Sequence, residues 1–320
     1  MIFEDLPTTP KSEQLIDSAF SRAARAGRAK QGLDGQQSML MTAANICSDN
    51  LENVERGWPD LDEIDPFYRE LADAVVGIDE LRQRLSSIGW ASRQIKQIEG
   101  QYQRRLRRHG EIDAAKKLRK QAFARIADVV RQVEDDLEWI ADARWELGKL
   151  PGIVTDEPAI VVAGYPNVGK SSFVNAVTRA DNEIASYPFT TTIIHVGHVE
   201  RNYIRYQLVD TPGLLDRPAE DRNEIESQTV SALEHLADCV LVFIDASESC
   251  GYQLDAQLAL RDDLNERFDA PLLTVCNKSD LSRDVDADLY MSIEEDDNVD
   301  GVLDAAIDAV GYEPELPFDG

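Results

Sequence analysis

The chain has 320 residues, of which 43% are hydrophobic, so it is long enough for two cores of about 150 residues each. Its 33 basic and 60 acidic residues give a formal net charge of -27, which argues against a nucleic-acid-binding surface over the whole protein. No apolar run approaches the ~18 residues of a membrane span, and the N-terminus lacks the basic-then-apolar order of a signal peptide. We therefore expect a cytoplasmic protein without a membrane partner.

The acidic residues are concentrated in the second half of the chain. Residues 1–157 carry 23 basic and 28 acidic side chains, whereas residues 158–320 carry 10 and 32. Asp outnumbers Glu, and only 9 of the 33 basic residues are Lys, a bias that suits proteins kept soluble in concentrated salt. We expect a halophilic source. The alternative is an ordinary acidic protein whose charge opposes self-association.

From Ser12 to about Leu150 the apolar residues recur at helical spacing, with few glycines or prolines. This pattern predicts an all-α bundle of four or five helices, the last from about Glu111 to Gly148. The expected breaks between helices fall at 32–35, 58–66, 86–90 and 110. We divide the chain into a helical bundle at 1–150, a connector at 151–157 and a nucleotide-binding domain at 158–320.

After residue 158 short β-branched runs alternate with helical stretches, which predicts an α/β domain with helices on both faces of a sheet. The predicted strands are 159–163, 193–199, 203–209, 239–244 and 272–276. Only three residues separate the second and third runs, so these two strands must form an antiparallel hairpin. The fold prediction is therefore a mostly parallel sheet with one antiparallel edge strand.

The four cysteines form no CxxC pair, and three of them lie in or beside predicted strands. In a cytosolic chain this predicts reduced, mostly buried thiols rather than disulfides. The residues are Cys47, Cys239, Cys250 and Cys276.

A phosphate-binding loop follows the first predicted strand. Its sequence matches GxxxxGK[ST] between a strand and a helix, which is the context that this pattern requires. The glycines let backbone N–H groups approach phosphates, the lysine adds a charge at the outer phosphates and the serine hydroxyl is able to bind Mg²⁺. The residues are Gly164, Tyr165, Pro166, Asn167, Val168, Gly169, Lys170 and Ser171, and Ser172 opens the helix.

The motif Asn277-Lys278-Ser279-Asp280 follows the strand 272–276, at the edge of the sheet where nucleotides bind. A carboxylate at Asp280 accepts hydrogen bonds from N1–H and the exocyclic amine of guanine, whereas adenine has no N1–H and would leave it unpaired. Asn277 is expected to tie this loop to the phosphate loop, and the Lys278 stem to cover the base. The sequence predicts guanine rather than adenine.

Two further loops supply the expected magnesium and γ-phosphate contacts. Asp210, at the end of a hairpin strand, is expected to hold Mg²⁺ through a water, and the Gly213 N–H to sense the γ-phosphate. Thr191, with Thr192 as the second candidate, is expected to complete the Mg²⁺ shell with Ser171. Lys170, Thr191 and Gly213 are the expected catalytic residues for hydrolysis of GTP to GDP and phosphate.

Two weaker signals remain. The pair Ser292-Ile293 is the candidate for a last loop whose backbone contacts the guanine oxygen. His195 and His198 lie on opposite faces of the predicted hairpin, and we interpret them as ordinary strand residues rather than metal ligands or catalytic groups.

These motifs, in this order, resemble the translation-factor-related GTPases, and Tyr187-Pro-Phe-Thr-Thr resembles the Obg group. The strings Asp210-Thr-Pro-Gly-Leu-Leu-Asp-Arg-Pro, Arg222-Asn-Glu-Ile-Glu and Asp245-Ala-Ser-Glu-Ser-Cys-Gly-Tyr resemble the nucleolar GTP-binding (Nog) family of large-subunit assembly factors. The resemblance covers the helical half and implies a short archaeal member. Ile293 departs from the usual Ser-Ala pair of the last guanine loop.

The resemblance implies that the helical bundle docks on ribosomal RNA in a precursor of the large subunit. The charge pattern agrees, because residues 93–131 contain twelve basic and four acidic residues. The candidate RNA contacts are Arg104, Arg105, Arg107, Arg108, Lys116, Lys117, Arg119 and Lys120. The alternatives are a solvated helix face, a protein-binding signalling or trafficking switch without RNA, and a GTPase attached to RNA modification, although no catalytic cysteine or metal spacing supports the last.

We also expect potassium to stimulate hydrolysis. Leu214 follows Asp210-Thr-Pro-Gly213 in place of the glutamine that orients water in many GTPases, so we expect slow intrinsic turnover. Asn167 stands where related potassium-dependent GTPases place the asparagine that binds K⁺. The expected cofactors are therefore Mg²⁺ and K⁺, although Asn167 could merely cap the amides of its own loop.

Overall fold

The computed structural model describes residues 2–3, 5–108, 111–150, 152–178, 183–186, 193–216 and 222–312. These residues form two compact units. One unit comprises Ile2–Glu63 and Val76–Gly148, and the other combines Ile64–Val75 with the described part of Lys149–Gly320. The second unit therefore includes a helix from the N-terminal half. The division into a bundle at 1–150, a connector at 151–157 and a nucleotide-binding domain at 158–320 stays a prediction.

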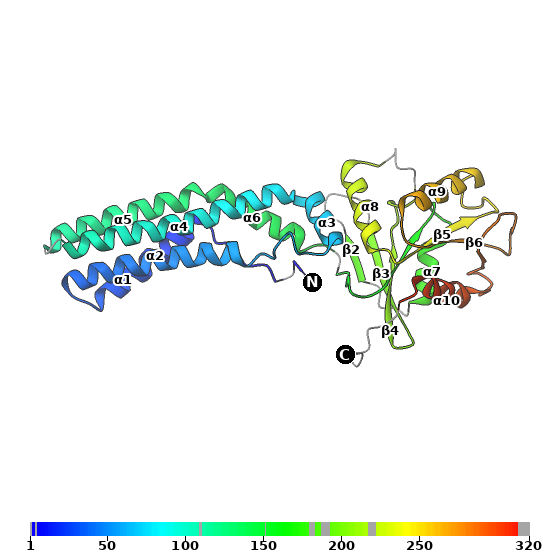
Figure 1. Cartoon of the computed structure of the whole chain (residues 1–320), viewed down its shortest axis with the longest axis horizontal. Coiled ribbons are helices and arrows are strands. Elements are labelled where there is room, and N and C mark those ends of the chain that lie inside the picture. Colours follow the sequence, from blue (N-terminus) through cyan, green and yellow to red (C-terminus); the bar gives the residue numbers. More distant parts are fainter. Residues whose placement is uncertain are drawn as a thin grey trace. The chain divides into compact units, whose positions relative to one another are not determined.

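The first unit is an all-α bundle, as predicted from the helical spacing of apolar residues. Helices α2, α4 and α5 pack on one another, and α1 packs against α2 and α5 (Figure 1). The bounds are α1 Ser12–Arg28, α2 Gly32–Arg56, α4 Ile78–Arg108, α5 Ile112–Gln132 and α6 Glu134–Leu147. The fully buried side chains of Leu40, Leu51, Leu81, Ile88 and Ile95 lie along α2 and α4 and form part of the core.

Two of the predicted helix boundaries are wrong. The expected break at 86–90 does not occur, because α4 is continuous through Gly89, which lies under the Glu55 side chain of α2. The break lies instead at Gly77, whose φ of +75° is left-handed and ends the preceding helix. The predicted last helix is also divided, because Val133 leaves helical geometry between α5 and α6.

Helix α3 spans Pro66–Val76, and its residues up to Val75 belong to the second unit. Phe67 is fully buried, and the Tyr68 hydroxyl donates a hydrogen bond of 2.5 Å to the Ile153 carbonyl. This bond joins α3 to the chain that leads into the sheet, although 85 residues separate the two partners.

The second unit is built on a seven-stranded sheet of order β2-β3-β4-β1-β5-β6-β7. Strand β3 is antiparallel to both neighbours and all other pairs are parallel. The prediction of a mostly parallel sheet is confirmed, but β2 lies outside β3, so the antiparallel strand is next to the edge. The bounds are β1 Ala159–Ala163, β2 Glu183–Ser186, β3 Ile193–Arg201, β4 Ile204–Asp210, β5 Cys239–Asp245, β6 Leu272–Asn277 and β7 Leu289–Tyr290.

Helices cover both faces of this sheet, with α8 and α9 on one face and α7 and α10 on the other (Figure 1). The bounds are α7 Lys170–Val177, α8 Glu224–Leu236, α9 Leu254–Arg267 and α10 Val299–Val310. Every residue of β1 and β5 is buried, as expected of central parallel strands that are covered on both faces. The carboxyl ends of β1, β5 and β6 therefore lie side by side at one edge of the core.

The four cysteines are unpaired and buried, which confirms the prediction of reduced thiols. Burial raises the pKa of Cys47 and of Cys239 to about 12, so both thiols stay protonated and unreactive near neutral pH. Within the described ranges, no helix is both long and apolar enough to cross a membrane.

The buried face of α5 should contribute to the stability of the helical unit. Ile126 is fully buried, so Ile126→Ala should lower the free energy of unfolding by about 2–5 kcal/mol through lost burial and cavity formation. Ile112, on the same helix, is 48% exposed, and Ile112→Ala should cost less than about 1 kcal/mol. Urea unfolding followed by the helical circular dichroism signal measures both, and equal losses would contradict the assignment of Ile126 to the core.

Candidate nucleotide-binding site

The predicted phosphate loop joins the buried strand β1 to helix α7. Gly164 has a φ of +128° and Gly169 a φ of +104°, and Asn167 is left-handed at +64°. A Cβ at Gly164 would lie 2.4 Å from the Phe243 carbonyl oxygen of β5. Because this oxygen belongs to the backbone of a buried strand, a change of side-chain rotamer would not remove the clash. The first glycine of the motif is therefore required both by its backbone angle and by the neighbouring strand.

Lys170 starts helix α7 and is buried at 5% exposure. Its ammonium donates hydrogen bonds of 2.6 Å and 2.9 Å to the carbonyls of Gly164 and Tyr165 in the same loop. Burial lowers the pKa of Lys170, and the charges of Asp210 and Asp216 oppose that shift. A desolvated cation at the start of a helix, inside the predicted phosphate loop, is suited to bind anionic phosphate oxygens.

Asp210 ends strand β4 and is fully buried. The Ser171 hydroxyl donates a hydrogen bond of 2.5 Å to its Oδ2, whereas Oδ1 is buried without a hydrogen-bond partner among the described residues. Burial raises the pKa of Asp210, against the hydrogen bond from Ser171 and the charge of Lys170. An unpartnered carboxylate oxygen beside a serine hydroxyl is a donor set that fits Mg²⁺.

The expected threonine ligand cannot be placed in this geometry. Thr191 and Thr192 lie outside the described residues, as does the rest of the segment 187–192. Ser171 and Asp210 are therefore the two predicted magnesium residues that the structure brings together.

Asp216 was missed by sequence reasoning. The Gly213 N–H, predicted to sense the γ-phosphate, donates a hydrogen bond of 2.7 Å to Asp216 Oδ2. The Asp216 carboxylate is nearly buried and lies close enough to Lys170 to affect its pKa. An acid three residues after Gly213 was the only signal in the sequence, because its return to the Gly213 amide depends on the loop conformation.

The predicted guanine loop borders a cavity of about 510 Å³ next to the phosphate loop. Asp280 is exposed at this cavity, and the Asn277 amide donates a hydrogen bond of 2.8 Å to the Val168 carbonyl. The two nucleotide loops are thereby joined directly, as expected for Asn277. The lining residues are Asn167, Gly169, Ser172, Asn277, Lys278, Asp280, Leu281, Ser292, Ile293, Glu294 and Glu295.

Ser292 and Ile293 both line the cavity and lie in the turn that follows β7. The Ser292 N–H donates to the Asp297 carbonyl at 3.0 Å, and the Glu295 N–H donates to the Ser292 hydroxyl at 3.3 Å. Ser292 is 1% exposed, and its hydroxyl already accepts a hydrogen bond within its own turn.

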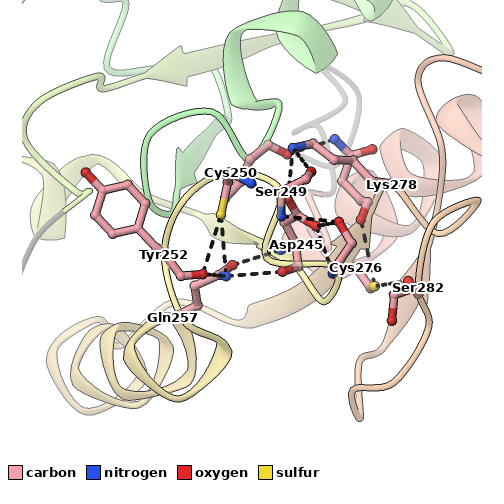
Figure 2. Close-up of polar contacts among 11 residues, drawn as sticks. Asp245, Ser249, Cys250, Tyr252, Gln257, Cys276, Lys278 and Ser282 are labelled. Atoms are coloured by element: carbon pink, nitrogen blue, oxygen red, sulfur yellow. Dashed lines mark hydrogen bonds and ion pairs between the residues drawn. The ribbon is translucent and has the colours of Figure 1, made fainter.

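A second group of residues behind the guanine loop was also missed. Lys278 donates hydrogen bonds to Asp245, the last residue of β5, and to Ser249, which follows that strand (Figure 2). The sequence signal was a carboxylate at the end of one parallel strand and a lysine after the next, but strand order was needed to place them together. His195 and His198 lie on β3, and the described residues contain no group of three or more His, Cys, Asp and Glu side chains that could hold a metal.

The predicted RNA-contacting residues gather at one end of the helical unit. Four end helix α4 and four lie in the first half of α5, which packs on α4. Seven of the eight are exposed, whereas Arg119 is half-buried and its guanidinium lies 5.1 Å from the ring centroid of Phe123. Burial lowers the pKa of Arg119. Arg119 is therefore better placed to pack on Phe123 than to contact phosphate.

Comparisons with known proteins agree with both units. Residues 3–154 match the NOG1 N-terminal helical domain, and residues 159–278 match the family described as 50S ribosome-binding GTPase. An uncharacterized protein of Methanocaldococcus jannaschii, MJ1408, is 36% identical over 87% of this chain and 81% of its own length.

Nucleolar GTP-binding protein 1 of Arabidopsis thaliana is 40% identical, and that of Saccharomyces cerevisiae is 32% identical. The matches cover 87% and 89% of this chain, but 43% and 46% of those proteins. This chain therefore spans less than half the length of these nucleolar relatives.

The geometry of the cavity predicts a change of base specificity. Asp280→Asn should lower affinity for GDP and admit xanthosine diphosphate, because xanthine presents a carbonyl where guanine presents an amine and Asn donates a hydrogen bond to it. Fluorescence titration with both nucleotides measures the effect. Asp284→Asn, at an exposed carboxylate four residues further along the chain that does not line the cavity, is the control and should retain the preference for guanine. Equal guanine binding by Asp280→Asn and the parent would remove Asp280 from the site.

Proposed function

This chain belongs to the nucleolar GTP-binding protein 1 (NOG1) family, and we propose on that premise that it assembles the large ribosomal subunit. Its GTPase-family domain would bind and hydrolyse GTP, and the nucleotide state would gate docking on, and release from, the precursor of the subunit. The observation that carries the proposal is the combination in one chain of a nucleotide site with a separate basic helical surface.

Mg²⁺ would be held by Ser171 directly and by the unpartnered oxygen of Asp210 through a water, with Thr191 as a further proposed ligand. The ion would neutralise charge on the outer phosphates during hydrolysis. Lys170 would exchange its two carbonyl partners for phosphate oxygens, since its ammonium already lies inside the loop. Gly213 would turn its N–H from Asp216 to the γ-phosphate. In the exchanges of Lys170 and Gly213, a contact with the nucleotide would replace a hydrogen bond within the protein.

The exposed ends of α4 and α5 would bind ribosomal RNA. Arg93 and Arg131 are paired with Glu55 and Glu13, and Lys96 is paired with Glu52. By contrast, the described residues provide no ion-pair partner for Arg104, Arg105, Arg107 or Arg108, and all four are exposed. Arg104 donates from Nε to the Gly100 carbonyl at 3.1 Å, and the Arg105 guanidinium lies 4.8 Å from the ring centroid of Tyr102, but neither contact neutralises the positive charge that phosphate oxygens would bind. A basic surface in a protein of net charge -27 is expected to select a polyanion.

Potassium would assist hydrolysis. The Leu214 side chain, which follows Gly213, is 1% exposed and apolar, so it cannot orient a water by hydrogen bonding. Another positive charge is then needed between the β- and γ-phosphates. The exposed, left-handed Asn167 would hold K⁺ there. A halophilic source, proposed from the excess of Asp and the scarcity of Lys, would keep K⁺ abundant around the site.

Association with the subunit is tested directly by sedimentation. Lysate of the source cells, supplied with a non-hydrolysable GTP analogue, should place the protein with the large subunit or its precursors in a sucrose gradient. GDP should shift it toward the top of the gradient. Sedimentation as a free protein with both nucleotides would contradict the proposal and favour a protein-binding switch.

The contribution of the basic surface is measured by replacing Arg104, Arg105, Arg107 and Arg108 with Ala. RNA affinity should fall and the slope of log affinity against log salt should flatten by about 0.7–0.9 per lost phosphate contact. The matched control replaces four ion-paired arginines, Arg56, Arg82, Arg93 and Arg131, and changes the net charge by the same amount. If the two quadruple variants lowered RNA affinity equally, the loss would reflect the change in net charge and not specific phosphate contacts of the basic surface.

Potassium dependence is measured as GTP turnover in matched KCl and NaCl. The parent should hydrolyse GTP faster in KCl, and Asn167→Ala should lose the preference while it retains GDP binding. Equal rates of the parent in the two salts would exclude a role for K⁺. A preference that persists in Asn167→Ala would move the ion to other residues.

A further inference from the structure

The segment 245–252, which runs from the last residue of strand β5 toward helix α9, contacts both nucleotide loops. Asp245 at its start binds Lys278 of the guanine loop. Tyr252 at its end packs against Tyr165 of the phosphate loop, with ring centroids 4.4 Å apart. We refer to residues 245–252 as the β5 loop. The β5 loop contacts Lys278 and Tyr165 of the two nucleotide loops, and none of the sequence motifs assigned it a role.

The Asp245 carboxylate is fully buried, and both of its oxygens are saturated with hydrogen bonds. Oδ1 accepts from the N–H and hydroxyl of Ser247 at 2.9 Å and 2.5 Å. Oδ2 accepts from the Ser249 hydroxyl at 2.9 Å, the Cys250 N–H at 2.8 Å and the Lys278 ammonium at 2.8 Å. Burial raises the pKa of this carboxyl, but the bonds from Lys278 and the serines outweigh it and hold the pKa at about 2.

Gln257 of helix α9 fixes the backbone on both sides of this carboxylate. Its Oε1 accepts from the Asp245 N–H at 2.8 Å, and its Nε2 donates to the Asp245 carbonyl at 3.1 Å and the Tyr252 carbonyl at 2.9 Å. Gln257 is itself buried at 2% exposure. Asp245 therefore has one orientation, which is set by the strand behind it and the helix beside it.

Lys278 is held at both ends. Its backbone is left-handed, with φ at +55°, and its ammonium donates to Asp245 and, at 2.9 Å, to the Ser249 hydroxyl. Between these two ends the stem lines the cavity that contains Asp280. The stem is thus a preformed wall of the cavity, because the conformational entropy of a long side chain is lost before a ligand enters.

We propose that Asp245 is a positioning residue for guanine nucleotide, which anchors the ammonium of Lys278 so that the lysine stem forms a rigid wall against the base. The proposal rests on the guanine site assigned above. A base that leaves such a wall gives up its packing without any gain in lysine freedom. The expected consequence is slow dissociation of the bound nucleotide rather than faster association.

A purely structural role is the competing explanation, since Asp245 also accepts from two backbone N–H groups of its own loop. The two explanations differ in their coupling to Lys278. A carboxylate that acts through the lysine loses its effect when the lysine amine is absent, whereas a loop cap acts regardless of it. A double-mutant cycle between the two residues separates them.

The experiment measures dissociation of the fluorescent nucleotide mant-GDP from the full chain by chase with unlabelled GDP. Asp245→Asn and Lys278→Met, which keeps an apolar stem without the amine, should each speed dissociation about tenfold, the effect of one charged hydrogen bond. The double variant should also be about tenfold faster. A hundredfold, additive effect would overturn the positioning role, as would an unchanged rate in Asp245→Asn.

Two further variants keep the test decisive if Asp245→Asn does not fold. Ser249→Ala removes one of the two ammonium partners and should speed dissociation a few fold, but have no effect beside Lys278→Met. An unchanged rate in Ser249→Ala would overturn the proposal. Asp288→Asn is the control, because Asp288 accepts from the Thr274 N–H in the first half of strand β6 and should leave the rate unchanged.

Failure of this inference is distinguishable from failure of the proposed function. A parent that retains no mant-GDP would overturn the guanine site and the role of Asp245 together. Retention of the nucleotide with no coupling between Asp245 and Lys278 would overturn the positioning role alone. Ribosome association is measured by sedimentation and does not enter these dissociation rates.

Discussion

The nucleotide site depends on how closely the phosphate loop approaches strand β5. A Cβ on Gly164 would lie 2.4 Å from the Phe243 carbonyl, so the loop can leave β1 in this direction only if that position is glycine. The close approach brings the loop level with the ends of β5 and β6, where Asn277 reaches the Val168 carbonyl. The proposed phosphate and base sites would therefore share one edge of the sheet, and a hydrogen bond between their loops would reduce the freedom that nucleotide binding has to remove.

Burial of charge is the second constraint on this edge. Lys170 and Asp210 both lie in the protein interior. Burial lowers the pKa of Lys170 and raises the pKa of Asp210, so it favours the neutral form of each side chain. The loop carbonyls around Lys170 and the Ser171 hydroxyl beside Asp210 compensate only in part. A phosphate and a divalent cation would supply the missing opposite charges, so binding relieves a desolvation cost that the fold itself imposes.

Asp245 and Asp210 show how position in the sheet separates the roles of two buried carboxylates. Asp245 accepts five hydrogen bonds and has a pKa of about 2, so it is a permanently charged anchor. Asp210 retains an oxygen without a partner among the described residues, and its pKa is raised by burial. Asp245, whose oxygens are fully hydrogen-bonded, stabilises contacts within the protein, whereas Asp210, with one unpartnered oxygen, is suited to bind a ligand.

The sequence by itself determined the α/β class of the second unit, the phosphate loop and the guanine loop, because each is a short string whose strand and helix neighbours are local. It also determined the helical class of the first unit from the spacing of apolar residues. It did not distinguish Gly77, which ends a helix, from Gly89, which Glu55 covers within a continuous one. Nor did it pair Asp245 with Lys278, 33 residues away, or return Asp216 to the Gly213 amide. Only the tertiary structure decided these contacts, because they depend on which strands are neighbours and which helices touch, and no local pattern encodes either.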